Sequence, residues 1–178
     1  DAYAALPLTF LLMAGDPAAV EPIVRQVTAA TPFDQTTWAY QATAWRMMDD
    51  EREFWLCDYE RFVTPIRVGE LSTPPREQAD YARWLAEVLD TLHIGKAEPG
   101  DQSLRGGTQT AGALFDRRHP VLKQFRSDVL NAARAIQREW PDAPDHPFLS
   151  RRSDAMRFAG SWSVRLARGG HHVAHSHT

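Results

Sequence analysis

The segment 156–166 has the two-residue period that is typical of a β-strand. Its apolar side chains fall at even positions, namely Met156, Phe158, Trp162, Val164 and Leu166. We expect the Gly169–Gly170 pair that follows to form a tight turn. His175 and His177 come next, and side chains two residues apart on an extended chain point to the same side. The C-terminal segment therefore predicts a strand, a turn and two neighbouring imidazoles.

Two imidazoles on one side of a strand can bind one divalent metal ion. Neutral imidazole suits iron, zinc, copper and nickel, so His175 and His177 are candidate metal ligands. A His-rich surface loop is the alternative, because His171 and His172 lie close by. A metal site needs at least a third ligand, and the sequence stops at Thr178.

The composition is that of a globular protein. Of the 178 residues 43% are apolar, with six Trp and eight Phe, which suffices for a core. A net charge of -3 argues against a nucleic-acid or anionic-membrane partner. No apolar run approaches the roughly 20 residues of a membrane span. The single cysteine, Cys57, predicts a buried thiol and a reducing, cytoplasmic location. Because the chain begins without Met, we expect it to be a fragment of a longer polypeptide.

Residues 1–68 have the pattern of paired helices. Asp16 and Pro17 predict the start of a helix that ends before Pro32. Asp50, which lies 34 residues after Asp16, predicts a similar helix that ends at Pro65. An apolar helical stretch precedes each, at 2–13 and 34–48. An offset of 34 residues is the period of tetratricopeptide helix pairs, with two ordinary helical hairpins as the alternative.

The rest of the chain mixes helices with a polar strand. A linker is expected at 69–75, followed by a helix that ends near Gly95. A short strand rich in polar residues is expected at 103–110. The long amphipathic stretch from Pro120 to Trp140 predicts a helix.

The second half of the chain contains five motifs, which in chain order are QSLRGGTQT at 102–110, LF at 114–115, HPFL at 146–149, GSWSVRL at 160–166 and GHxxxHxH at 170–177. Together they closely resemble a bacterial family of oxygenases that depend on Fe(II) and 2-oxoglutarate. Members of the family often carry tetratricopeptide repeats upstream. The resemblance implies an α+β fold, with a helical repeat-like segment at 1–68 and the first part of a double-stranded β-helix, a jelly roll with flanking helices, at 69–178.

The resemblance also implies a site and a reaction. His175 would be the first iron ligand, and His177 stands where most of the wider superfamily has a carboxylate. The implied enzyme is a dioxygenase with Fe(II) and 2-oxoglutarate as cofactor and cosubstrate, which hydroxylates a small molecule or a protein. A distal histidine and a basic anchor for 2-oxoglutarate would lie downstream, so residues 1–178 alone are expected to be inactive. The helical repeats would offer a surface for a protein partner.

Three further residues are candidates for the pocket. Arg105 and Gln109 share one side of the polar strand and would face cosubstrate or substrate, or else bond to neighbouring loops. Trp162 would wall the pocket, or else belong to the core. His93 and His119 lie at helix ends and are expected at the surface or as caps.

Two other functions fit the same sequence. Gly169, five residues and then His175-x-His177 also match the first half of the cupin motif, which belongs to a metal-binding barrel of related architecture. The chain would alternatively be a repeat-based interaction module whose barrel is not catalytic.

Overall fold

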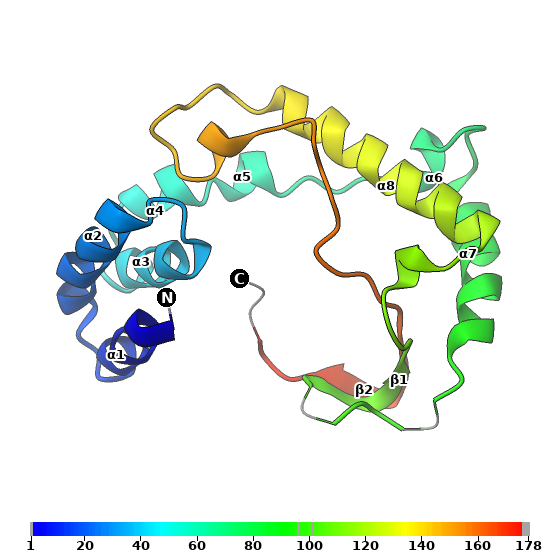
Figure 1. Ribbon diagram of the computed structural model, residues 1–178, viewed down its shortest axis with the longest axis horizontal. Coiled ribbons are helices and arrows are strands. Elements are labelled where there is room, and N and C mark those ends of the chain that lie inside the picture. The colour runs from blue at the N-terminus through cyan, green and yellow to red at the C-terminus, as the bar shows by residue number, and fades with distance from the viewer. Residues whose placement is uncertain (1, 96, 101, 176–178) are drawn as a thin grey trace. The chain divides into compact units, whose positions relative to one another are not determined.

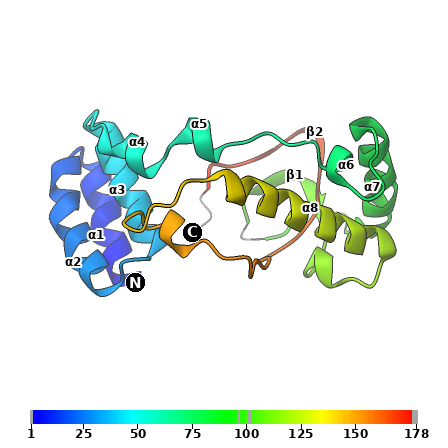
Figure 2. The ribbon, with the colours of Figure 1, turned by 90° about the horizontal axis from the view of Figure 1, so that it is seen from above.

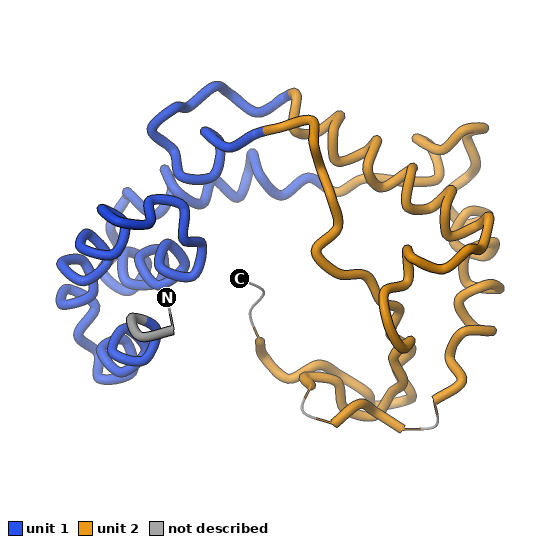
Figure 3. The backbone as a smooth tube through the Cα atoms, in the orientation of Figure 1, with its two compact units in different colours: residues 1–64, 139–152, 178 blue, residues 65–138, 153–177 orange. Residues whose placement is uncertain are grey.

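A computed structural model describes residues 2–95, 97–100 and 102–175. These residues form two compact units, drawn in different colours in Figure 3. Unit 1 consists of residues 2–64 and 139–152, and unit 2 of residues 65–138 and 153–175. Within the described residues, no helix has both the length and the apolar character needed to cross a membrane.

Unit 1 is built from helices (Figure 1). They are α1 (Ala2–Met13), the 3-10 helix η1 (Pro17–Ala19), α2 (Val20–Ala30), α3 (Gln35–Met47), α4 (Arg52–Leu56), α5 (Tyr59–Phe62) and the 3-10 helix η3 (Leu149–Arg151).

Aspartate side chains begin two of these helical segments. The Asp16 carboxylate accepts a hydrogen bond from the backbone N–H of Ala19 at 3.3 Å. The Asp34 carboxylate accepts one from the N–H of Thr37 at 2.9 Å, and also one from the Thr37 hydroxyl. Both bonds from Thr37 lower the pKa of Asp34. Each carboxylate satisfies an N–H group that a helix start leaves without a partner, which confirms the predicted start at Asp16.

The single helix predicted from Asp50 to Pro65 is wrong. The chain forms α4 and α5 instead, with a break at Cys57 and Asp58. The Asp58 carboxylate accepts a hydrogen bond from the N–H of Arg61 at 3.1 Å, which starts a new helix. The tetratricopeptide-like organisation of residues 1–68 stays a prediction.

The core of unit 1 lies where α1, α2 and α3 pack against one another. Leu8, Val20, Val24 and Ala44 form it, and each is at most 3% exposed. Burying a Leu or Val side chain contributes roughly 1.5–3 kcal/mol, so these few residues supply much of the unit's stability.

An aromatic cluster fastens segment 139–152 to the helices of unit 1. The Phe62 ring lies 5.5 Å from Trp140, 5.8 Å from His146 and 5.8 Å from Phe148, measured between ring centroids. The His146 ring is buried, and its Nδ1 accepts hydrogen bonds from the N–H groups of Phe148 and Leu149. This ring therefore caps η3 from within the cluster.

Unit 2 contains three helices, one 3-10 helix and two strands among its described residues. They are α6 (Val68–Leu71), α7 (Gln78–Leu92), β1 (Leu104–Gln109), η2 (Leu114–Asp116), α8 (Pro120–Glu139), whose last residue opens the second segment of unit 1, and β2 (Val164–His172). The predicted linker at 69–75 contains most of α6, which packs beside α7 (Figures 1 and 2). The helix predicted from Pro120 is confirmed by α8.

Helices α7 and α8 meet around a buried hydrogen bond. The Tyr81 hydroxyl donates to Asp128 Oδ2 at 2.7 Å, and Gln124 Nε2 donates to the other carboxylate oxygen at 2.8 Å. Burial and the neighbouring Asp128 raise the pKa of Tyr81. The buried carboxylate thus has a donor on each oxygen.

The prediction of a jelly roll in residues 69–178 is wrong. The described residues contain a single antiparallel pair, β1 with β2, and the remaining regular elements are helical. The segment 156–163 alternates in polarity but has no partner strand among the described residues. The Phe158 ring packs on Phe115 at 4.5 Å instead. The same finding overturns the barrel that the cupin alternative shares.

The predicted turn at Gly169–Gly170 is also wrong, because β2 runs through both glycines to His172. The register changes here: Leu166 pairs with Gly107 and His171 pairs with Arg105, so residues 167–170 lie opposite Gly106. This is a bulge, a feature that bends a strand and redirects the side chains beyond it.

Glycine is required at this bulge. A Cβ atom on Gly170 would overlap the carbonyl oxygen of Gly106, and one on Gly107 would lie 2.7 Å from the carbonyl oxygen of Arg165. Gly106 itself has a φ of +64°, which side chains disfavour. The Gly-Gly pairs of the two strands therefore permit the close backbone approach that sets the position of the histidines.

Candidate functional site

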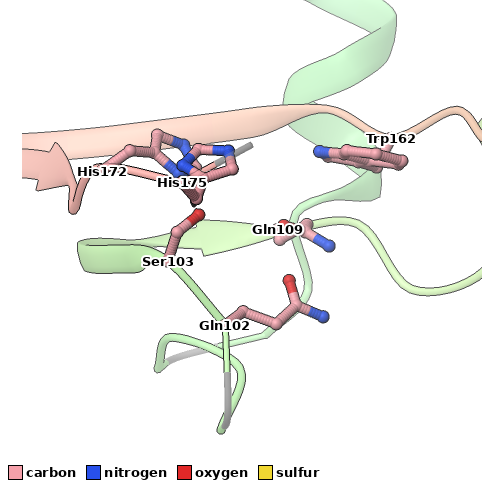
Figure 4. A pocket seen from close by; sticks show the side chains of 6 residues that line it. All are labelled: Gln102, Ser103, Gln109, Trp162, His172 and His175. Atoms are coloured by element: carbon pink, nitrogen blue, oxygen red, sulfur yellow. Dashed lines mark hydrogen bonds between the residues drawn. The ribbon is translucent and has the colours of Figure 1, made fainter. Parts of the chain in front are cut away.

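A pocket of about 500 Å³ opens beside the antiparallel strands β1 and β2 of unit 2 (Figure 4). We call this strand pair the hairpin, although residues 110–163 separate its two strands in sequence. The pocket is lined by Gln102, Ser103, Gln109, Trp162, His172 and His175. Strand β1 and the residues before it supply the first three, and the other three come from segments that flank or end β2. The hairpin thus brings together residues that lie far apart in the sequence.

Two imidazoles lie next to each other in this pocket. The ring centroids of His172 and His175 are 5.5 Å apart, with an angle of 37° between the ring planes. A nitrogen–metal distance of about 2.0–2.1 Å places two imidazoles on one ion with centroids roughly 4.5–5.5 Å apart. The spacing of the two rings is therefore compatible with a shared metal ion.

Hydrogen bonds orient both rings. His175 Nδ1 lies 2.9 Å from the carbonyl oxygen of Val173, and His172 Nδ1 lies 2.9 Å from the Ser103 hydroxyl. A carbonyl oxygen only accepts, so Nδ1 of His175 carries the proton and the lone pair of that ring is on Nε2. Metal-binding histidines commonly donate their other N–H to a carbonyl in this way.

The donor set fits a transition metal in its chemistry, with two ligands from the described residues. Neither ring is buried, so an ion can reach both from solvent. Among residues 2–95, 97–100 and 102–175, no group of three or more His, Cys, Asp or Glu side chains is arranged to hold an ion.

The structure describes four of the five predicted site residues, and three of these four line the pocket. His175, Gln109 and Trp162 all line the pocket. The Arg105 guanidinium donates to the carbonyl oxygens of Gln102 and Leu104, at 2.6 and 2.7 Å, and is not among the lining residues described. The predicted ligand His177 lies outside the described residues.

Sequence reasoning missed the role of His172. The sequence predicts a turn at Gly169–Gly170, and His171 and His172 favour a His-rich surface loop as the alternative to a metal site. The strand continues through those glycines, and its bulge brings His172 to the pocket. The only available signal was Gly-Gly in both polar segments, which is compatible with a close crossing of two strands.

Behind the pocket, His93 joins helix α7 to the hairpin. Its Nδ1 lies 2.9 Å from the Thr108 hydroxyl and its Nε2 lies 3.0 Å from the Ser163 hydroxyl. Of the two expected positions, at the surface or as a cap, the structure shows the cap: His93 is the C-cap residue of α7 and is only 8% exposed. Burial, and secondly the positive charge of Arg165, lower the pKa of His93. The expectation for His119 is confirmed, because its exposed ring accepts a hydrogen bond from the N–H of Val121 at the start of α8.

The chain was compared with known proteins at three levels. It matches no protein-family model, no curated protein and no solved structure, so the family that its motifs resemble is not established by these comparisons.

Proposed function

We propose that this chain carries histidine ligands and a pocket wall of an oxygenase that uses Fe(II) and 2-oxoglutarate. The observation that supports it best is the pair of neighbouring imidazoles, His172 and His175, in one pocket. Imidazole is a common ligand of non-heme iron. The choice of 2-oxoglutarate comes from the motif resemblance and extends the proposal beyond metal binding.

The chain's own residues would fix the ligands in place. The Val173 carbonyl holds the proton of His175 on Nδ1, which directs the Nε2 lone pair toward an ion. The Ser103 hydroxyl forms a hydrogen bond of 2.9 Å with Nδ1 of His172 and orients that ring. Ligand orientation is therefore set by the hairpin.

The remaining lining residues would bind and shield the reactants. The amide groups of Gln102 and Gln109 offer donors and acceptors to a polar cosubstrate, and the Trp162 ring covers one side of the pocket. The chemistry supplied by bound Fe(II) is the coupled decarboxylation of 2-oxoglutarate and hydroxylation of a substrate. In balance, 2-oxoglutarate, O2 and a C–H bond give succinate, CO2 and a C–OH group.

Metal binding is tested first. We expect the 178-residue chain to bind Co²⁺, a spectroscopic substitute for Fe(II), and His172→Ala and His175→Ala each to weaken binding at least about tenfold. His119→Ala is the matched control, because that exposed ring lies at the start of α8. His177→Ala tests the predicted ligand outside the described residues. Binding that survives the loss of both His172 and His175 would contradict the site.

Turnover is tested second, on the full product of the gene. We expect succinate to form with Fe(II), O2 and 2-oxoglutarate, and the signal to disappear with His175→Ala. Metal binding without 2-oxoglutarate binding would favour a metal protein of another class. A protein that binds neither would favour the repeat-based interaction module.

A further inference from the structure

We infer that His93 is a positioning residue, which fixes the Gln109 and Trp162 wall of the pocket by holding the hydroxyls of Thr108 and Ser163 from behind. His93 does not line the pocket described above, and no residue of α7 does. The inference rests on the proposed function only for what the pocket binds, because the geometry of the wall can be measured without metal or turnover.

The first step in the argument is which residues His93 holds. Thr108 lies in β1 immediately before Gln109, and Ser163 follows Trp162 immediately before β2. Successive side chains on a strand point to opposite faces, so a contact with Thr108 from one face fixes where Gln109 lies on the other. Each of the two wall residues is therefore next in sequence to a residue bonded to His93.

The second step is that one ring bonds to both sides of the hairpin. The two hydroxyls come from segments 55 residues apart in sequence, and the His93 ring nitrogens reach both, at 2.9 and 3.0 Å. A second link lies beside them, since Ser163 N–H donates to the Thr110 hydroxyl and Thr110 N–H donates to the Ser163 carbonyl, both at 3.0 Å. A two-stranded sheet is marginal in water by itself, so ties of this kind decide its position.

The third step is that a neutral imidazole can serve both hydroxyls. A neutral imidazole donates from one nitrogen and accepts at the other, so it can serve one hydroxyl as donor and the other as acceptor. The charged groups nearest to it are Asp90 on its own helix and Arg165 on β2, which face each other at 3.6 Å. Both side chains of that pair are more than half exposed, which leaves His93 as the buried tie.

The experiment uses the fluorine NMR signal of Trp162 in protein labelled with 5-fluorotryptophan. The chain has six Trp, and Trp162→Phe identifies the relevant resonance. We expect a single sharp Trp162 resonance in the wild type. With His93→Phe, which keeps a flat ring but removes both hydrogen bonds, we expect that sharp resonance to be lost while the other five stay in place.

Two further variants separate positioning from general stability. His93→Gln keeps one donor and one acceptor and should restore the sharp resonance. Thr108→Val removes a single hydroxyl and should shift the Trp162 line without lowering the urea midpoint of unit 1. This milder variant keeps the test decisive if the His93→Phe protein fails to fold. An unchanged Trp162 line in folded His93→Phe or Thr108→Val protein would overturn the inference.

Spectra recorded with and without Co²⁺ distinguish a failure of the proposed metal site from a failure of the inference about His93. A paramagnetic ion at His172 and His175 should broaden the wild-type Trp162 line more than the line of Trp84, which also belongs to unit 2 but is not among the residues that line the pocket. If no Co²⁺ binds, the proposed metal site fails, while the metal-free spectra still decide the role of His93.

Discussion

The helices of unit 1 and the hairpin of unit 2 are held by different kinds of contact. In unit 1, apolar side chains such as Leu8 and Val24 are buried between α1, α2 and α3. In the hairpin, the decisive contacts are the close approach of the Gly106 and Gly170 backbones and the hydrogen bonds between the His93 ring and two hydroxyl groups. Apolar packing tolerates many side chains of similar volume, whereas the hairpin depends on particular atoms.

This difference accounts for where the candidate site lies. Residues that must meet a ligand have to stay accessible, and the exposed His172 and His175 do so at the end of β2. An element with little apolar burial is also one that opens most readily, and binding residues are often found in such elements. The comparison therefore predicts that changes in the two units act separately.

Loss of core volume in unit 1 should have the largest effect. Leu8 is fully buried, so Leu8→Ala removes buried methyl groups and leaves a cavity, at a cost of roughly 2–5 kcal/mol in unfolding free energy. Leu6→Ala on the same helix is the control, because Leu6 is 66% exposed and the change should cost less than about 0.5 kcal/mol. Urea denaturation followed by helical circular dichroism measures both. Equal losses would show that α1 is not packed as described.

The next largest effect should come from Gly170→Ala in the hairpin. The added Cβ would overlap the Gly106 carbonyl, so the strands must move apart, at a cost of roughly 1–3 kcal/mol. We expect faster hydrogen exchange of β1 and β2 amides and weaker Co²⁺ binding, with no change in α1–α3. Gly100→Ala is the control, because no atom lies within 4 Å of its added Cβ. If the Gly170→Ala protein retained its Co²⁺ affinity, the metal site would not depend on the geometry of the bulge.

The same contrast explains what the sequence could predict. The start at Asp16 and helix α8 follow from local rules, because caps and apolar periodicity act within a few residues. The predicted polar strand at 103–110 is confirmed by β1. The break at Asp58 was missed, although an Asp side chain that caps a new turn is a local signal.

The hairpin register could not be predicted in this way. It depends on a bulge and on the contact between Gly106 and Gly170, which are 64 residues apart. The sequence predicts His175 from its spacing to His177, Gln109 from its side of the polar strand and Trp162 as a pocket wall, and the pocket contains all three. His172 and His93 were not, because their roles arise from tertiary contacts with Ser103, Thr108 and Ser163.

The smallest expected effect is a difference between the two units in the pH at which each loses stability. The pKa of His93 is lowered by burial and then by Arg165, below an ordinary value of 6.5. The unfolded chain therefore takes up a proton on His93 as the pH falls through about 6.5, while the folded hairpin resists it. The hairpin is fully stabilised at neutral pH and loses stability as the pH drops below that value.

Unit 1 should respond only at lower pH. The hydrogen bond from Arg46, and secondarily that from Tyr59, lower the pKa of the buried Glu53 carboxyl below an ordinary value of 4.5. This contribution is complete above about pH 4.5 and is lost as the pH falls further. Hydrogen exchange, corrected for the intrinsic effect of pH on exchange, should thus show β1 and β2 amides opening as the pH falls below about 6.5, while α3 and α4 stay protected until the pH falls below about 4.5. His93→Gln should abolish the first response and Glu53→Gln the second, whereas His119→Gln should change neither. If both units lose protection together, the hairpin and the helices unfold as one cooperative body, and the contrast between their contacts has no consequence for stability.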